Sequence, residues 1–346
     1  MKKFFMIMIA LMVAITVSAC KKEVVKEGKF DKADGQYFAV SETANNGYVY
    51  WTVVTIKDKK ITDVEWDGYN VDGGASKCLG DSKYQCSVDG NYKMKDIAQS
   101  PKGYWYEQAD KATKWIVDNQ KVKADVTFKE GKTDAISSVS ITTETLFNLV
   151  DTALNTDPVA KGDYAKDGFY YIEAAASDNR EYSYVAQYED GTPVLDDNQE
   201  PVLFEATAGE YQDYTFGTFI IVNGRIVHAD FNATYKLYDF KMEENKFVLS
   251  DGKKIVLCDE NGDPLNTYLT KDTAGMNYGM RAAGGEWYEQ ADKVEAKLVA
   301  DQSLNITIES GDWGPSGTID GLSSVTFGHS VVDFNTILED LNSKAK

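Results

Sequence analysis

Two short segments rich in hydroxyl side chains have the residue types needed to hold or carry a phosphate group. The first runs from Asp134 to Ser140 (DAISSVS), and the second, far along the chain, runs from Asp320 to Thr326 (DGLSSVT). In each, an acidic residue precedes three hydroxyls and a segment with the pattern of an amphipathic helix follows. The hydroxyls are Ser137, Ser138 and Ser140 in the first segment, and Ser323, Ser324 and Thr326 in the second.

The residues alone leave two interpretations of these segments open. A hydroxyl at the start of a helix accepts a hydrogen bond from a free backbone N–H and so caps the helix, which contributes about 0.5 to 2 kcal/mol. The same free N–H groups also favour the oxygens of a phosphate, so that one hydroxyl is placed to carry a phosphate ester.

Both segments belong to a longer internal repeat. The sequence GYWYEQADKATKWIVDNQ at 103–120 recurs as GEWYEQADKVEAKLVADQ at 285–302, with WYEQADK identical, and other blocks recur in the same order. We therefore predict two tandem repeats, at 34–154 and 164–342, joined by a linker at 155–163. The second repeat carries acidic insertions near 185–212 and 237–265, where turn-forming residues indicate added hairpins or loops.

The elements expected around the hydroxyl segments are the same in both repeats. Runs rich in β-branched and aromatic residues flank a short turn, which predicts a β-hairpin; a helix follows, then a strand, the hydroxyl segment and a terminal amphipathic helix. The predicted fold class is α+β, with mostly antiparallel sheet and amphipathic helices. The expected ranges are strands 53–56, 61–66, 219–222 and 226–231, helices 105–119 and 287–302, strands 125–128 and 305–308, and helices 143–154 and 331–342.

The first twenty residues have the features of a secretion signal. A basic start at Lys2 and Lys3 precedes an apolar run that is too short to span a bilayer, and the segment ends in Val-Ser-Ala-Cys20. This ending resembles the lipobox of bacterial lipoproteins, in which the cysteine is acylated, for example with palmitate, and becomes the first residue of the mature chain. We expect residues 1–20 to be a lipoprotein signal peptide, and 21–33 to be a charged tether between membrane and domains.

The content of cysteine, histidine and charged residues limits which kinds of site and partner we expect. Cys78 and Cys86 are eight residues apart in a segment expected to face an oxidising compartment, where they can form a disulfide, and Cys258 is left over as a buried thiol. With only His228 and His329 in the chain, we expect no metal site and no histidine-dependent catalysis. A net charge of −19 argues against a nucleic-acid partner.

The hydroxyl segments, the WYEQADK helix and the lipobox together resemble the FMN-binding domain of flavinylated proteins, which occurs in tandem in lipoproteins of extracellular electron transfer. The family motif is Asp, two residues, Ser or Thr, Gly, Ala, then Thr or Ser. A flavin transferase esterifies the last hydroxyl to the FMN phosphate. The resemblance implies that Thr326 and Ser140 are the acceptors and that Asp320 and Asp134 are the motif acids. Ser324 and Ser138 stand where the family has Gly, so a positive φ there would be strained.

The resemblance also implies a function. The chain would be a lipid-anchored electron carrier, not an enzyme, on the extracellular face of the cell membrane, receiving electrons from a membrane quinone pool or NADH dehydrogenase. The alternative is a surface lipoprotein without flavin that uses the same scaffold for ligand binding or adhesion. Trp105 and Trp287 either stack on the flavin ring or anchor their helices, and four residues are candidates for the pocket wall: Tyr92, Met94, Tyr278 and Met280.

Overall fold

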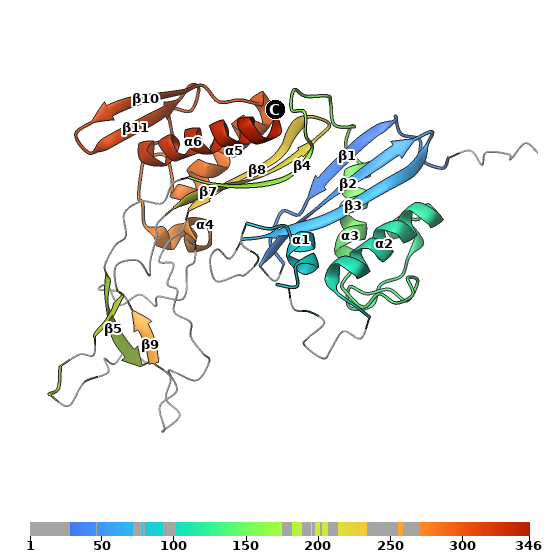
Figure 1. Ribbon diagram of the computed structural model, residues 1–346, viewed down its shortest axis with the longest axis horizontal. Helices are drawn as coiled ribbons and strands as arrows, with labels where there is room; N and C mark the ends of the chain where they lie inside the picture. Colours follow the sequence, from blue (N-terminus) through green and yellow to red (C-terminus); the bar gives the residue numbers. More distant parts are fainter. Residues whose placement is uncertain are drawn as a thin grey trace, which may run out of the picture.

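The protein is a mixed α/β structure in which helices pack on small antiparallel sheets (Figure 1). The structure is a computed structural model and describes these residues: 28–45, 47–71, 78, 80–92, 94, 102–174, 182–188, 195, 198–200, 203–206, 214–233, 255–258 and 270–346. We call residues 28–154 the first half and residues 164–346 the second half.

The first half is built on a three-stranded antiparallel meander. Strands β1 (Gly35–Val40), β2 (Tyr48–Lys57) and β3 (Lys60–Asn70) follow each other in the sheet, which confirms the predicted hairpin. The turn between β2 and β3 places Asp58 and Lys59 at positive φ, the conformation that tight hairpin turns need. Three helices complete this half: α1 (Lys83–Val88), α2 (Trp105–Asn119) and α3 (Glu144–Leu154).

The second half repeats this order with additions. Its meander consists of β4 (Gly168–Glu173), β7 (Thr215–Val222) and β8 (Arg225–Ala233), again with the predicted hairpin. The helices are α4 (Lys271–Ala274), α5 (Trp287–Asp301) and α6 (Gly328–Ala345). Strands β10 (Ile306–Gly311) and β11 (Gly314–Ile319) form a separate hairpin between α5 and α6.

The helices α2 and α5 end in the same way. Gln120 and Gln302 follow them in the left-handed conformation. Each side chain reaches a strand: Gln120 bonds both the N–H and the carbonyl of Ile61, and Gln302 does the same with Ile226, at 2.7 to 2.9 Å. These amides therefore fix the distance between helix and sheet in both halves.

Two of the predicted boundaries need correction. The strand expected at 125–128 does not form, because a 3₁₀ turn, η2 (Lys123–Asp125), precedes it and the chain reverses at Glu130-Gly131, leaving a single bridge between Lys129 and Lys132. The helix expected from residue 331 begins at Gly328. The corresponding strand of the second half does form, as β10, because the connection from Gln302 to Asp320 is four residues longer than that from Gln120 to Asp134 and supplies its partner β11.

The predicted insertions contribute a further three-stranded sheet. Strand β5 (Tyr182–Tyr188) pairs with β6 (Leu203–Ala206) on one side and β9 (Ile255–Cys258) on the other, all antiparallel. The turn residues used to predict these insertions lie outside the described residues, as does the side chain of Cys258.

The two meanders contact each other through the faces opposite to their helices. Alternate residues of β2 face the helices, while Trp51 and Val53 pack against Ile220 and Val222 of β7. The buried Tyr69 hydroxyl also crosses this contact, lying 2.7 Å from His228 Nε2 and donating to Asp230 Oδ2 at 2.8 Å. Burial lowers the pKa of His228 to about 4, so its imidazole is neutral at pH 7.

Candidate functional site

Ser140, the predicted acceptor of the first half, is held by a buried glutamine of α2. Gln108 is fully buried, and its Oε1 accepts from the backbone N–H of Ser140 at 2.7 Å and from the Ser140 hydroxyl at 3.1 Å. The amide nitrogen of Gln108 donates to the Gly103 carbonyl at 3.0 Å, which fixes the orientation of the side chain. Ser140 itself is half-buried.

Thr326, the predicted acceptor of the second half, is held in the same way. Gln290 of α5 is fully buried, and its Oε1 accepts from Thr326 N at 2.7 Å and from Thr326 Oγ1 at 3.2 Å. Its amide nitrogen donates to the Gly285 carbonyl at 2.7 Å. Unlike Ser140, Thr326 is exposed.

The other hydroxyls and acids of the two segments lie on the surface. The apolar residues between them point inward, since Ile136 and Val139 are buried and Leu322 and Val325 are partly buried. The expected strain is present in one copy: Ser138 has φ +60, whereas in the second copy the left-handed residue is Gly321. The exposed residues are Asp134, Ser137, Ser138, Asp320, Ser323 and Ser324.

The capping interpretation of the acceptor hydroxyls is wrong. The N-cap of α3 is Thr143 and that of α6 is Phe327, and neither position has a side-chain cap hydrogen bond. Ser140 and Thr326 precede these positions and are tied instead to the preceding helix through Gln108 and Gln290. Ser140 and Thr326 are therefore not the N-cap residues of α3 and α6.

A lysine surrounded by aromatic rings lies beside the glutamine site of the first half. Lys83 is 3% exposed, and its Nζ lies 4.1 to 5.3 Å from the centroids of four rings while donating to the Tyr50 hydroxyl. Burial lowers the pKa of Lys83 to about 7, and nearby Asp67 opposes that shift. The four rings belong to Tyr48, Tyr50, Tyr92 and Trp105.

The second half has a more open version of this cluster. Lys271 Nζ lies 5.2 Å from the ring of Tyr278 and 5.1 Å from the ring of Trp287. Trp287 stacks on Phe327 with 5.5 Å between centroids, and Phe327 directly follows Thr326. The aromatic cluster therefore adjoins the acceptor residue.

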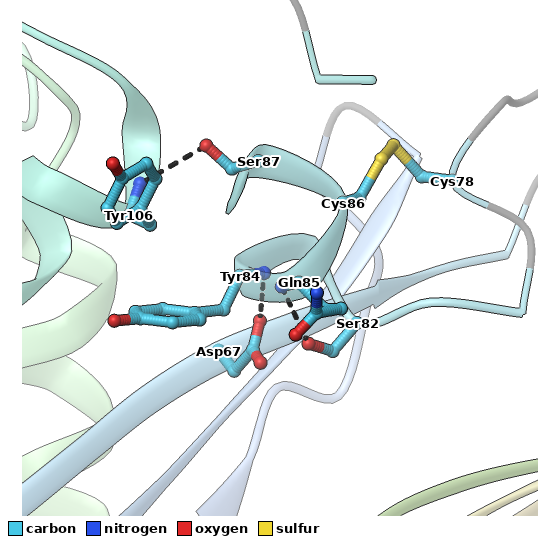
Figure 2. Close-up of a disulfide and its surroundings, with 8 residues drawn as sticks. All are labelled: Asp67, Cys78, Ser82, Tyr84, Gln85, Cys86, Ser87 and Tyr106. Atoms are coloured by element: carbon cyan, nitrogen blue, oxygen red, sulfur yellow. Dashed lines mark hydrogen bonds between the residues drawn. A yellow bond between two sulfur atoms is a disulfide. The ribbon is translucent and has the colours of Figure 1, made fainter. Parts of the chain in front are cut away.

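Figure 2 shows contacts that fix α1, the helix to which Lys83 belongs. Asp67 Oδ1 accepts from Tyr84 N at 2.8 Å, and Ser82 caps the helix by accepting from Gln85 N at 3.2 Å. The disulfide between Cys78 and Cys86, as predicted, closes the preceding loop. Ser87 Oγ accepts from the N–H of Tyr106 at 3.3 Å, which joins α1 to the start of α2.

Asn232 takes the place of Asp67 in the second half. Its Oδ1 accepts from Asp272 N at 3.3 Å, beside Lys271, as Asp67 does from Tyr84 beside Lys83. Burial raises the pKa of Asp67 to about 6, while hydrogen bonds from Ser82, Tyr84 and Gly68 oppose this shift.

The predicted pocket-wall residues lie near these clusters. Tyr92 is one of the rings around Lys83, and Tyr278 lies against Lys271. Met280 receives a hydrogen bond from Gln290 Nε2 at its sulfur, at 3.6 Å. Met94 packs partly buried against the core of the first half. Trp105 and Trp287 are themselves deeply buried, which confirms their role as helix anchors.

Sequence reasoning missed Gln108, Gln290, Lys83 and Lys271. The signal for the glutamines was present, because a polar residue three positions after Trp lies on the apolar face of an amphipathic helix in both copies of WYEQADK. The lysines share only a preceding Ser or Thr, in Ser82-Lys83 and Thr270-Lys271.

Four carboxylates from β8, α4 and α5 form a second cluster in the second half. Burial is the first cause that raises the pKa values of Asp230, Asp272, Glu295 and Asp292. Members of this group raise them further for Asp230, Asp272 and Glu295, and Glu289 does so for Asp292. No group of His, Cys, Asp or Glu among the described residues is arranged to hold a metal ion. A cavity of about 100 Å³ between the halves is lined by Trp51, Glu65 and Ile220, among others, and includes no acceptor residue.

Cys20 and the rest of residues 1–27 lie outside the described residues, so the lipobox stays a prediction. Within the described part of the chain, none of the helices has the length and apolar character required to cross a membrane.

Comparisons with known proteins give little further information. No protein-family model matches the chain, and no curated protein matches it. The chain is similar to a solution NMR structure from Clostridium thermocellum, a target of the Northeast Structural Genomics Consortium, with 33% identity over 35% of this chain and 88% of that chain. The TM-score of 0.26 is too low for this likeness to bear on fold or function.

Proposed function

We propose that this chain is a lipid-anchored electron carrier made of two tandem FMN-binding-type domains, with FMN attached by phosphoester bonds to Thr326 and Ser140. A flavin transferase would attach the cofactor, and a membrane quinone pool or NADH dehydrogenase would supply electrons for acceptors outside the cell. The observation that carries the proposal is the repeated hydrogen-bond pair from a buried glutamine to the acceptor residue, Gln108 to Ser140 and Gln290 to Thr326.

The surroundings of both acceptors suit a phosphate. Lys102 Nζ donates to the carbonyl of Val139, next to Ser140, at 3.1 Å. In the second half Lys293 Nζ donates to the Gly284 carbonyl at 2.7 Å, and a Cβ on Gly284 would lie only 1.9 Å from the Ser324 carbonyl oxygen. Lysine cations near exposed or half-exposed hydroxyls provide the charge that a phosphate ester needs.

The aromatic clusters suit the ring system of the cofactor. Half-buried Tyr278 offers a ring for stacking, while the buried Trp287 and Phe327 support the aromatic cluster that adjoins Thr326. Lys271 brings positive charge to this cluster, which favours negative charge on a neighbouring group. FMN, when attached, supplies reversible electron transfer, while the chain positions and shields it.

The residues of the chain thus have defined tasks in the proposal. Gln290 holds both the N–H and the hydroxyl of Thr326, so Oγ1 has a fixed position at the surface where a transferase can reach it. Because the Oγ1 proton is directed toward Gln290 Oε1, the oxygen lone pairs are free to form a new bond. Gln108 performs the same task for Ser140.

The direct test is the mass of the protein after coexpression with a flavin transferase. We expect an adduct of the mass of FMN at each acceptor, with Thr326→Ala and Ser140→Ala each removing one and the double variant removing both. Thr142→Ala and Thr318→Ala, which alter exposed hydroxyls outside the two segments, are the matched controls. An unmodified wild-type protein without flavin fluorescence would refute the proposal and favour a surface lipoprotein that binds ligands or adheres without flavin.

A further inference from the structure

The β10–β11 hairpin presents an exposed tryptophan next to one acceptor and has no counterpart at the other. Trp313 lies in the turn between the strands and is 92% exposed. No other large apolar side chain in the described part of the chain is as exposed. Ile308 on β10 is 44% exposed. The hairpin lies along α6 at the end of the molecule away from the β1–β3 meander (Figure 1). Exposure of an indole to water carries an unfavourable hydration free energy, and contact with a partner would remove it.

The tip of the hairpin is close in space to Thr326. His329 Nδ1 lies 2.8 Å from the Pro315 carbonyl, two residues beyond Trp313. A Cβ on Gly328 would lie 1.9 Å from Ser316 Oγ, so the first turn of α6 is in direct contact with the tip. Since Thr326 immediately precedes this turn, an enzyme that reaches Thr326 Oγ1 meets the hairpin tip.

The first half has a tight turn at the same place. Glu130 and Gly131, both at positive φ, close the chain after the single bridge between Lys129 and Lys132. Gly131 accepts from Glu144 N at 3.0 Å, so this turn also packs on the start of its helix, but it carries no apolar side chain. The difference between the halves is therefore an addition beside Thr326 alone.

We propose that the β10–β11 hairpin is the docking element for the enzyme that attaches FMN to Thr326, with Trp313 as its anchor. This inference rests on the proposed function. Exposed Glu309 and Asp312 flank the indole, so the enzyme surface it fits is an apolar recess with a basic rim. Docking at the hairpin makes Thr326 the preferred acceptor over Ser140.

The reaction served by this docking replaces the Oγ1–H bond of Thr326 with an Oγ1–P bond. Condensation with free FMN would release water and is unfavourable in water, so the donor must carry FMN in a phosphoanhydride, as a flavin dinucleotide does. The P–O–P bond breaks, the nucleoside monophosphate leaves, and it takes up the electron pair of that bond while the Oγ1 proton passes to solvent.

The test measures initial rates of Thr326 modification in the mature chain, using a purified flavin transferase and a flavin dinucleotide. Peptide mass spectrometry separates the Thr326 product from the Ser140 product. We expect Trp313→Ala to raise the KM for the lipoprotein about tenfold at unchanged kcat, the effect of losing an interface anchor. Glu309→Lys with Asp312→Lys should also raise KM, whereas Val88→Ser, which removes an exposed apolar side chain of α1, should match the wild type.

Two results would overturn the inference while leaving the proposed function intact. The first is a Trp313→Ala variant whose KM equals that of Val88→Ser. The second is an equal loss of modification at Ser140, because a docking element beside Thr326 acts on Thr326 alone. A wild-type protein that gains no adduct at either residue would instead refute the proposed function, and this inference with it.

Discussion

The two halves hold Ser140 and Thr326, the proposed acceptors, by the same hydrogen bonds but differ in how open the surroundings are. In the first half Ser140 is half-buried, Lys83 is enclosed by four rings, and a disulfide closes the loop before α1. In the second half Thr326 is exposed and a hairpin extends beside it. The two halves therefore share the hydrogen bonds from the glutamine, whereas the exposure of the hydroxyl differs between them.

The disulfide should give the largest difference between the halves. Replacing both Cys78 and Cys86 by Ser removes the link that closes the loop before α1, and we expect a loss of about 2 to 4 kcal/mol. Hydrogen exchange measured by mass spectrometry should then become faster in α1 and the start of α2, which Ser87 joins. Peptides from α4 and α5 serve as the internal control, and equal acceleration there would contradict a local role for the disulfide.

The carboxylate cluster should make the second half more stable at mildly acidic pH than at neutral pH. A carboxyl whose pKa is raised by folding binds its proton more tightly in the folded state, so stability is gained as pH falls through the folded pKa. Burial raises the pKa of Asp230 from 3.8 to about 6. At about 1.4 kcal/mol for each pKa unit, this costs about 3 kcal/mol at neutral pH.

Glu295→Gln tests this cluster. The pKa of Glu295 is raised by burial and by Asp230 and Asp272, and the amide of the variant keeps an acceptor for the N–H of Phe231. We expect the variant to melt at a higher temperature than the wild type at pH 8 and to lose most of this advantage at pH 5. His228 titrates in both proteins, so their difference reports on Glu295. The exposed Glu309→Gln is the control, and an advantage that is the same at both pH values would contradict the electrostatic explanation.

The glutamine anchors should matter equally in the two halves. Gln108→Leu and Gln290→Leu each leave a backbone N–H without its acceptor, at Ser140 and Thr326, and we expect each to cost about 1 to 3 kcal/mol in urea unfolding. Each variant should also reduce FMN attachment only at its own hydroxyl. Loss of attachment at both hydroxyls in either variant would show that the anchors do not act locally.

Pattern reasoning found the elements but not the contacts that join them. The hairpins around 58–60 and 223–225 and the helices at 105 and 287 followed from local periodicity and turn residues, and all are present. The strand expected at 125–128 was wrong because a strand needs a partner, and the turn at Glu130-Gly131 returns the chain too early to supply one. The predicted strand does form in the second half, as β10, because the corresponding connection is longer and includes its partner β11.

The site was predicted in part for a similar reason. The sequence motif predicts Ser140 and Thr326 as acceptors, which stays a prediction. The lysines were not predicted, because Lys83 and Lys271 reach their rings through contacts between segments far apart in the chain. The insertion near 237–265 separates Lys271 from the hairpin it follows, which hides its correspondence with Lys83. Tertiary packing, not local pattern, brings these residues together.

The smallest expected change in stability is that of a surface ion pair, and it separates structure from function. Lys297 pairs with Asp301 at 2.7 Å on α5, and Lys114 pairs with Asp118 at 2.9 Å on α2. Substituting either lysine by Ala should cost only about 0.3 to 0.5 kcal/mol, as is usual for pairs spaced by four residues on an exposed helix face. Thermal unfolding should therefore hardly distinguish the two variants.

FMN attachment should distinguish them. The ammonium of Lys297 lies 3.5 Å from the position that a Cβ would take on Gly321, within the second hydroxyl segment. Lys114 has no comparable contact with a glycine in the part of the chain that the structure describes. We expect Lys297→Ala to slow attachment at Thr326 and Lys114→Ala to leave the rate unchanged, because only the first removes positive charge near the incoming phosphate. Equal rates would show that Lys297 does not assist attachment at Thr326. Lys293 would then be the cation left to support a phosphate at that loop.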